Sequence, residues 1–163
     1  MTAERATQPL AAAPFLVEDD LAPLPAPVRR YVLASGAVGR PVPQNLRLEM
    51  DAVMLRKPGD PGMAATSTQL NWFRSPTRLF LMKARMFGLP VRALHIYREE
   101  QATFQVRAAR LVTIVDQSGE SISGAETVTV LNDLCIFAPG ALVDPRLAWE
   151  QVDDRTATVT FTN

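Results

Sequence analysis

The sequence has very few of the residues that build disulfides and metal centres. Its 163 residues include one cysteine, Cys135, and one histidine, His95. A single cysteine excludes an internal disulfide, and a single histidine argues against a zinc site made only of side chains of this chain. A chain of this length buries about two thirds of its unfolded surface on folding. We therefore predict a domain that needs no metal or other cofactor.

The chain also lacks an excess of charge of either sign. It has 17 basic and 17 acidic residues, so it has no overall field that would attract nucleic acid. No apolar run approaches the length of a membrane span, and the first residues lack the apolar core of a signal peptide. These absences predict a cytoplasmic protein with no nucleic-acid partner and no membrane span.

Three familiar catalytic motifs are missing as well. The sequence has no glycine-rich phosphate loop, no Gly-x-Ser-x-Gly elbow and no His-Glu-x-x-His zinc helix. An enzymatic function therefore has no positive support in the motifs.

A short helix with both ends marked opens the folded part of the chain. Pro27 suits a first helical position because its fixed φ fits the helix and its missing N–H costs nothing there, while Gly36 can take the left-handed conformation that ends a helix. Between them Val28, Tyr31 and Val32 form one face. The paired Arg29 and Arg30 could bind an acidic ligand, but a solvated helix face is the preferred interpretation.

Alternation of apolar and polar residues follows the helix. Leu46, Leu48, Met50, Ala52 and Met54 alternate with Arg47, Glu49 and Asp51, and similar patterns recur between turn signals up to residue 118. This periodicity predicts half-buried antiparallel strands. A capping box at Ser123 and Glu126 predicts a second helix that continues to Pro139. Alternation over 156–162 then predicts a last strand.

We therefore predict an α+β fold. It consists of a curved antiparallel sheet of about six or seven strands, an incomplete barrel, with a short N-terminal helix and a second helix packed across the sheet. Residues 1–22 are rich in Ala and Pro and are predicted to be a mobile arm that packs Phe15 and Leu16 against the domain. Residues 23–163 are predicted to form one β-rich domain.

Several segments resemble a family of uncharacterised bacterial proteins. The opening signature is Leu24-Pro25-Ala26-Pro27-Val28-Arg29-Arg30-Tyr31 followed by Ala34-Ser35-Gly36. Other matching pieces are Trp72-Phe73, the run 86–91, the acidic helix over 126–134, the stretch 139–142, Trp149-Glu150 and the run 153–157. The resemblance covers about residues 22–162 and carries no established catalytic residues.

The resemblance implies further strands after the last residue of this chain. We therefore expect the domain to lack C-terminal strands, and an exposed last strand favours a homo-oligomer that pairs through it. The strand-rich pattern with a crossing helix is also similar to the incomplete barrel of periplasmic lipoprotein carriers, which implies a fold more than a function.

Three candidates for a catalytic or metal-binding role can also be explained as purely structural residues. His95 could act as a general base beside Glu99 or Glu100, but no motif surrounds it. Cys135 lies on an apolar helix stripe, which favours a small buried hydrophobe over a nucleophile. The acidic cluster of Glu150 and Asp153-Asp154 lacks the pattern of a calcium loop and is predicted to be a turn.

Methionine and aromatic side chains give a different signal. Methionines adapt to varied apolar partners, so a curved sheet lined by them could hold a lipid-like molecule under the second helix. An ordinary core under that helix explains the same pattern. The residues of this hypothetical apolar pocket are Met50, Met54, Trp72, Phe80, Met82, Met86 and Phe87.

The leading functional hypothesis is a non-enzymatic domain that binds a hydrophobic or lipid-like ligand. The second is a structural or interaction module that pairs through an open sheet edge. The third is an enzyme that uses His95 with Glu126 or Asp133. A cavity lined by methionine and aromatic side chains would favour the first, a filled core with pairing between chains the second, and a carboxylate within reach of His95 in a cleft the third.

Overall fold

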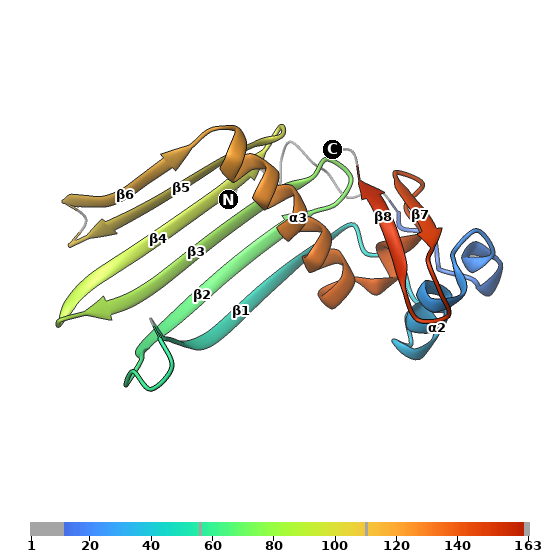
Figure 1. Cartoon of the computed structure of the whole chain (residues 1–163), viewed down its shortest axis with the longest axis horizontal. Helices are drawn as coiled ribbons and strands as arrows, with labels where there is room; N and C mark the ends of the chain where they lie inside the picture. Colours follow the sequence, from blue (N-terminus) through green and yellow to red (C-terminus); the bar gives the residue numbers. More distant parts are fainter. Residues whose placement is uncertain (1–11, 56, 110, 162–163) are drawn as a thin grey trace. The chain divides into compact units, whose positions relative to one another are not determined.

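The computed structural model describes residues 12–55, 57–109 and 111–161, which form helices and strands in an α+β arrangement (Figure 1). The elements are η1 (Glu18–Leu21), α2 (Ala26–Ala34), β1 (Asn45–Met54), β2 (Met63–Trp72), β3 (Thr77–Met86), β4 (Leu89–Arg98), β5 (Gln101–Ala108), β6 (Val112–Ser118), α3 (Glu120–Phe137), η2 (Pro139–Val143), β7 (Leu147–Gln151) and β8 (Ala157–Phe161). Residues 45–128 form one compact unit, and the segments before and after them form a second.

The first unit is an open antiparallel sheet. Its six strands lie side by side in chain order from β1 to β6, each joined to the next by a short turn. The register is regular except for one irregularity between Val106 and Arg107, where β5 pairs with β6. The predicted α+β fold with a six-strand antiparallel sheet before the second helix is confirmed.

The cross-strand register assigns each side chain to one of two faces, because directly opposed residues project from the same side of a sheet. We call the face that carries His95 the helix-side face. Its members are Leu46, Leu48, Met50, Ala52 and Met54 of β1; Met63, Ala65, Ser67, Gln69 and Asn71 of β2; Arg78, Phe80, Met82, Ala84 and Met86 of β3; Leu89, Val91, Ala93, His95 and Tyr97 of β4; Ala102, Phe104, Val106 and Ala108 of β5; and Val112, Val115 and Gln117 of β6. The predicted alternation along β1 is confirmed.

Helix α3 begins at Glu120, which is earlier than predicted. The Ser123 hydroxyl donates to the carbonyl of Gly119 at 2.9 Å and accepts the Ala102 N–H of β5 at 2.9 Å. The Glu126 carboxylate likewise contacts the sheet and not the helix backbone. The predicted helix is confirmed, but the predicted capping box is wrong because both of its residues bind strands.

The second unit contains the short helix. Helix α2 spans Ala26–Ala34, with Pro27 in its first turn, and the chain leaves it through Gly36 at a φ of 69°. Val28 and Val32 are buried, while the Tyr31 hydroxyl donates to the carbonyl of Cys135. The predicted helix and its glycine stop are confirmed.

The last predicted strand forms a separate hairpin. Strand β8 pairs with β7 and alternates half-buried with exposed residues, as its sequence predicts. In the turn between them an Asp153 carboxylate oxygen accepts the N–H groups of Arg155 and Thr156 at 2.7 and 2.8 Å. The turn predicted for the acidic cluster is confirmed. Within the described ranges no group of three or more potential metal ligands occurs, and no helix there is long and apolar enough to cross a membrane.

Leu16 anchors the N-terminal segment of the second unit. Its side chain has no exposed surface, and its backbone bonds to Arg40 at 2.9 Å and to Gly39 at 2.8 Å. The neighbouring Phe15 is 63% exposed. The register of this segment therefore selects Leu16, and not Phe15, for burial.

Truncating Leu16 tests this difference. We expect Leu16→Ala to lower the free energy of unfolding by about 2–5 kcal/mol, because it leaves a cavity in packed surroundings. Phe15→Ala, the matched control, is expected to change it by no more than about 0.5 kcal/mol. Urea unfolding measures both, and equal losses would show that Leu16 contributes no more than its exposed neighbour.

Asp144 and Arg146 form a local ion pair that lowers the pKa of the Asp144 carboxyl. Burial on its own raises the pKa of the Asp144 carboxyl, but the hydrogen bonds and positive charge of Arg146 together outweigh it and hold that pKa below its usual value. Arg146 reaches the two carboxylate oxygens with Nη2 at 2.6 Å and Nε at 3.0 Å. The charged form of Asp144 is therefore favoured by folding.

The pH dependence of stability follows from that direction. A carboxyl whose pKa is depressed by folding stabilises the protein above the unfolded value of about 3.9 and loses this contribution as the pH falls through the folded pKa. We expect the stability difference between the wild type and Asp144→Asn to be constant at neutral pH and to shrink below about pH 4. Urea unfolding over a pH series measures it, and a difference independent of pH would contradict the assignment.

Candidate functional site

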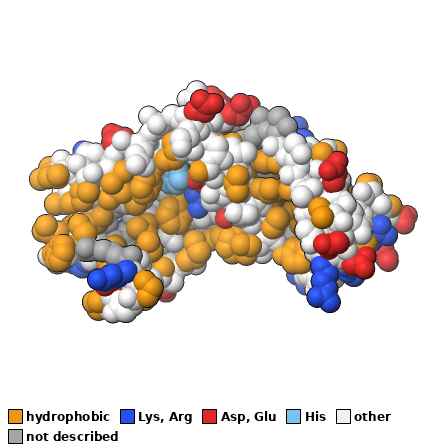
Figure 2. All heavy atoms as spheres, viewed as in Figure 1, with side chains coloured by type: hydrophobic (Ala, Val, Ile, Leu, Met, Phe, Trp, Pro, Cys, Tyr) orange, Lys and Arg blue, Asp and Glu red, His pale blue; other side chains and the backbone are white. Residues whose placement is uncertain are grey.

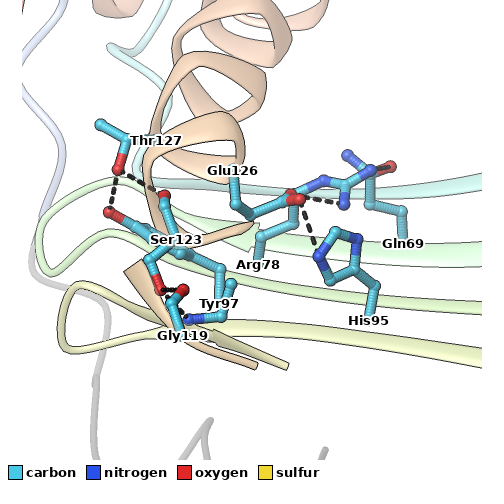
Figure 3. A network of polar contacts seen from close by, with 9 residues as sticks. Gln69, Arg78, His95, Tyr97, Gly119, Ser123, Glu126 and Thr127 are labelled. Carbon is cyan, nitrogen blue, oxygen red and sulfur yellow. Dashed lines mark hydrogen bonds and ion pairs between the residues drawn. The ribbon is translucent and has the colours of Figure 1, made fainter. Parts of the chain in front are cut away.

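A buried polar network joins β3 to helix α3 (Figure 3). Arg78 donates from Nη1 to Oε1 of Glu126 at 2.7 Å and from Nη2 to Oε1 of Gln69 at 3.0 Å. Gln69 donates in turn to the side-chain carbonyl of Asn71 at 3.0 Å. The Arg78 and Glu126 side chains are only 10% and 4% exposed, so the pair lies away from water. The guanidinium group also lies 5.0 Å from the centroid of the Phe80 ring.

His95 contacts the same carboxylate. Its Nε2 lies 2.9 Å from Oε2 of Glu126, at ion-pair distance, and its ring lies against Phe104 with the ring centroids 5.3 Å apart. Nε2 is shielded from solvent and makes no hydrogen bond of normal geometry. We therefore treat the contact as electrostatic, so its strength depends on the charge of His95. Of the four carboxylates proposed for His95, the structure brings Glu126 to it, while Asp133 belongs to the other compact unit. Glu99 and Glu100 lie in the turn after β4, where Glu99 pairs with Arg98.

Tyr97 fixes the beginning of helix α3 on the sheet. Its side chain has no exposed surface, and its hydroxyl lies 2.7 Å from the hydroxyl of Thr127. Together with the bond from Ala102 to Ser123, this contact attaches the first turns of α3 to β4 and β5. The helix is thus held over the end of the sheet at which the Glu126 network lies.

Arg78 is the only Lys, Arg, Asp or Glu on the helix-side face of the six strands. Its charge is compensated by Glu126. Beyond the row of His95 the same face carries methionine, alanine, valine and leucine almost exclusively. The face is therefore polar at one end and apolar along the rest of its length.

The predicted apolar residues divide into three groups. Met50, Met54, Phe80, Met82 and Met86 share the helix-side face. Trp72 pairs with Asn45 and Thr77, so it lies on the opposite face, where it is 4% exposed. Phe87 lies in the turn after β3 and is 86% exposed. The structure thus brings five of the seven predicted residues together.

Part of the apolar surface of the sheet is exposed. Figure 2 shows hydrophobic side chains gathered over the strands, with the one histidine of the chain, in pale blue, visible beside them. An open pocket of about 1030 Å³ lies toward the end of the sheet at which β3 turns into β4. Its lining combines Met63, Met86 and Phe87 with the charged residues Asp51, Lys83, Arg85 and Arg92. Of the seven predicted residues, Met86 and Phe87 line it. Its volume is at the upper end of the range typical of small-molecule sites.

Cys135 does not resemble a nucleophile. Burial raises the pKa of its thiol, which keeps the less reactive protonated form. It also belongs to the compact unit that does not contain His95. This agrees with the interpretation of Cys135 as a small apolar residue.

Sequence reasoning missed Arg78, Gln69, Asn71 and Tyr97. One signal was present for Arg78, because alternation places it on the same side of its strand as Phe80 and Met82. A charged residue in line with apolar ones requires a buried partner, but the partner is 48 residues away and no local pattern identifies it.

The fold and this network define an α+β protein with an open antiparallel sheet and a helix fixed across one end of it. The chain belongs to a family of unknown function, DUF6544, whose model matches residues 14–163. Neither the curated proteins nor the solved structures contain a significant match to the chain.

The Arg78–Glu126 pair can be tested by a double-mutant cycle. Breaking a buried pair leaves one charge without compensation, so Glu126→Met and Arg78→Met are each expected to cost about 3 kcal/mol of unfolding free energy. The combined replacement Arg78→Met with Glu126→Met is expected to cost less than the sum, because no charge then remains buried. Urea unfolding measures all four proteins, and additive losses would show that the two groups do not interact.

Proposed function

We propose that this protein binds a single-chain amphiphile, with the apolar chain on the helix-side face and the polar head at His95. The observation that carries the proposal is the division of this face into a polar end at Arg78, His95 and Glu126 and an apolar remainder. A fatty acid is likewise divided into a polar head and an apolar chain. An open sheet with a helix across it also agrees with the likeness to lipoprotein carriers that the sequence suggests, which we include in this proposal.

The apolar part of the face has room for a long chain. From His95 to Leu89 along β4 the strand advances about 20 Å, at roughly 3.3 Å for each residue. Met82 and Met86 of β3 accompany this path, and both are only half-buried. Because methionine side chains are flexible and polarizable, they can pack against alkyl chains of differing shape.

His95 supplies the polar contact for the head. Nε2 faces Glu126, and the ring's described contacts are with Glu126 and Phe104 alone. Nδ1 therefore makes no described hydrogen bond and is available to a ligand. Arg78 and Glu126 already compensate each other, so a carboxylic acid that shares its proton with Nδ1 adds no uncompensated charge.

Calorimetric titration with dodecanoic acid tests the proposal. We expect the wild type to bind it, and Met82→Gln to weaken binding at least about tenfold because an amide is then desolvated under the chain. Lys83→Gln, on the opposite face of the same strand, is the matched control and is expected to bind normally. Absence of binding to the wild type, or equal effects of both substitutions, would exclude the helix-side face as the site.

The titration also tests the role of His95. His95→Gln is expected to weaken the binding of dodecanoic acid more than that of dodecanol, because it changes the head contact and leaves the apolar path unchanged. Equal effects on the two ligands would place the head elsewhere.

An acid–base enzyme is a second candidate, because Glu126 lies 2.9 Å from His95 as a carboxylate that orients a general base would. Hydrolysis of an aryl ester of dodecanoic acid that is lost in His95→Gln would favour it over a binding protein. A module that pairs through the free edge of β1 or β6 would instead show self-association that does not depend on Met82 or His95.

A further inference from the structure

Three of the turns of the sheet lie together at one end. In a sheet whose strands follow chain order, alternate turns share an end, so the turns after β1, β3 and β5 lie opposite those after β2, β4 and β6 (Figure 1). We call the end formed by the turns after β1, β3 and β5 the tip end. Helix α3 begins at the other end, after β6.

Large apolar side chains are exposed at the tip end. Phe87 is 86% exposed in the turn after β3, Leu111 is 83% exposed in the turn after β5, and Leu55 is 57% exposed after β1. The strand ends beside these turns add Val53, Met54, Leu89 and Val112, which are 44–64% exposed. At the other end Phe73, in the turn after β2, is only 5% exposed. The exposed apolar residues of all three tips thus form a feature of this end alone.

The backbone at Phe87 also departs from ordinary turn chemistry. Its φ is 52°, a left-handed conformation that is strained for a bulky aromatic residue. The following Gly88 has a φ of 79°, so the turn places a large apolar side chain where glycine or asparagine is usual. This arrangement gains almost no burial for Phe87 within the chain.

Basic residues accompany the apolar tips. Lys83, Arg92 and Arg107 lie in one cross-strand row of the face opposite the helix-side face, and all three are exposed. Arg85 donates to the carbonyl of Gly88 at the tip itself, and Lys57 is exposed in the turn after β1. Asp51 and Asp60 are the acidic residues described near them, so positive charge is in excess there. At the other end the turns carry Glu99 and Glu100 together with the exposed Arg74, and α3 begins with Glu120, so basic residues are not in excess there.

We propose that the tip end docks on a lipid bilayer that contains anionic lipids. Exposed aromatic and aliphatic side chains partition into the boundary between headgroups and acyl chains, and lysine and arginine residues beside them bind anionic headgroups. Phe87, Leu111 and Leu55 enter the boundary, while Lys83, Arg85 and Lys57 contact headgroups. Exposed apolar patches mark protein or membrane interaction sites, and the basic residues beside these tips favour a membrane with anionic headgroups.

The inference does not depend on the proposed ligand, although the two fit together. The open pocket that Met86 and Phe87 help to line lies at the tip end, beside the turns that would dock. Membrane binding and dodecanoate binding are measured separately, and either can fail without the other.

Vesicle flotation tests the docking of the full chain. We expect the protein to float with vesicles in which about a third of the phosphatidylcholine is replaced by phosphatidylglycerol, and to bind far less to phosphatidylcholine alone or at high salt. Phe87→Ser combined with Leu111→Ser is expected to weaken binding at least about tenfold. Val152→Ser, which changes a residue 60% exposed outside the sheet, is the matched control and is expected to bind normally.

Three results would overturn the proposal. They are an absence of binding to either vesicle, equal binding of the double variant and the wild type, and self-association of the wild type that the double variant loses. The last would assign the tips to a second copy of the chain. Urea unfolding of the double variant shows whether it folds, and because both residues are exposed we expect its stability to be unchanged.

Discussion

The buried ion pair between Arg78 and Glu126 constrains where helix α3 lies on the sheet. Two charges removed from water must compensate each other, so the first turns of α3 have to lie where Glu126 reaches β3 at 2.7 Å. Hydrogen bonds between neutral groups, Tyr97 with Thr127 and Ala102 with Ser123, hold the same turns of α3 on β4 and β5. A helix with β-branched residues in its middle is thereby held by polar contacts as well as by apolar packing.

This constraint gives the sheet two unlike ends. Where α3 crosses the strands, the helix-side face contains Gln69, Asn71, Arg78 and His95 in one connected or adjacent group. Toward the tip end the same face is apolar and only partly buried, and its turns carry exposed hydrophobic residues. The proposals for ligand binding and for membrane docking both arise from this polarity, the first from the face and the second from the turns.

The helix α2 and the six strands could be predicted because local rules decide them. Pro27 and Gly36 bound one short helix, and alternation identifies the faces of β1 and β3 without knowledge of their neighbours. The prediction of a capping box at Ser123 was wrong because the side chains that suggested it can also bind partners outside the helix. Serine and glutamate bind any suitable partner, and strands β3, β4 and β5 offered better ones than the helix backbone. Strand β7 was not predicted, although it pairs with β8 across a short turn.

The sequence by itself thus determined the periodicities, the turns and the apolar character of one face, because each depends on residues within a few positions of one another. Only the tertiary structure decided that Arg78, His95 and Glu126 meet, that Trp72 lies apart from the methionines, and that three exposed tips share one end. Those relations depend on strand order and register, which bring together residues as far as 48 positions apart. Their physical reason is compensation of buried charge and burial of apolar surface over the whole sheet, which no short segment contains.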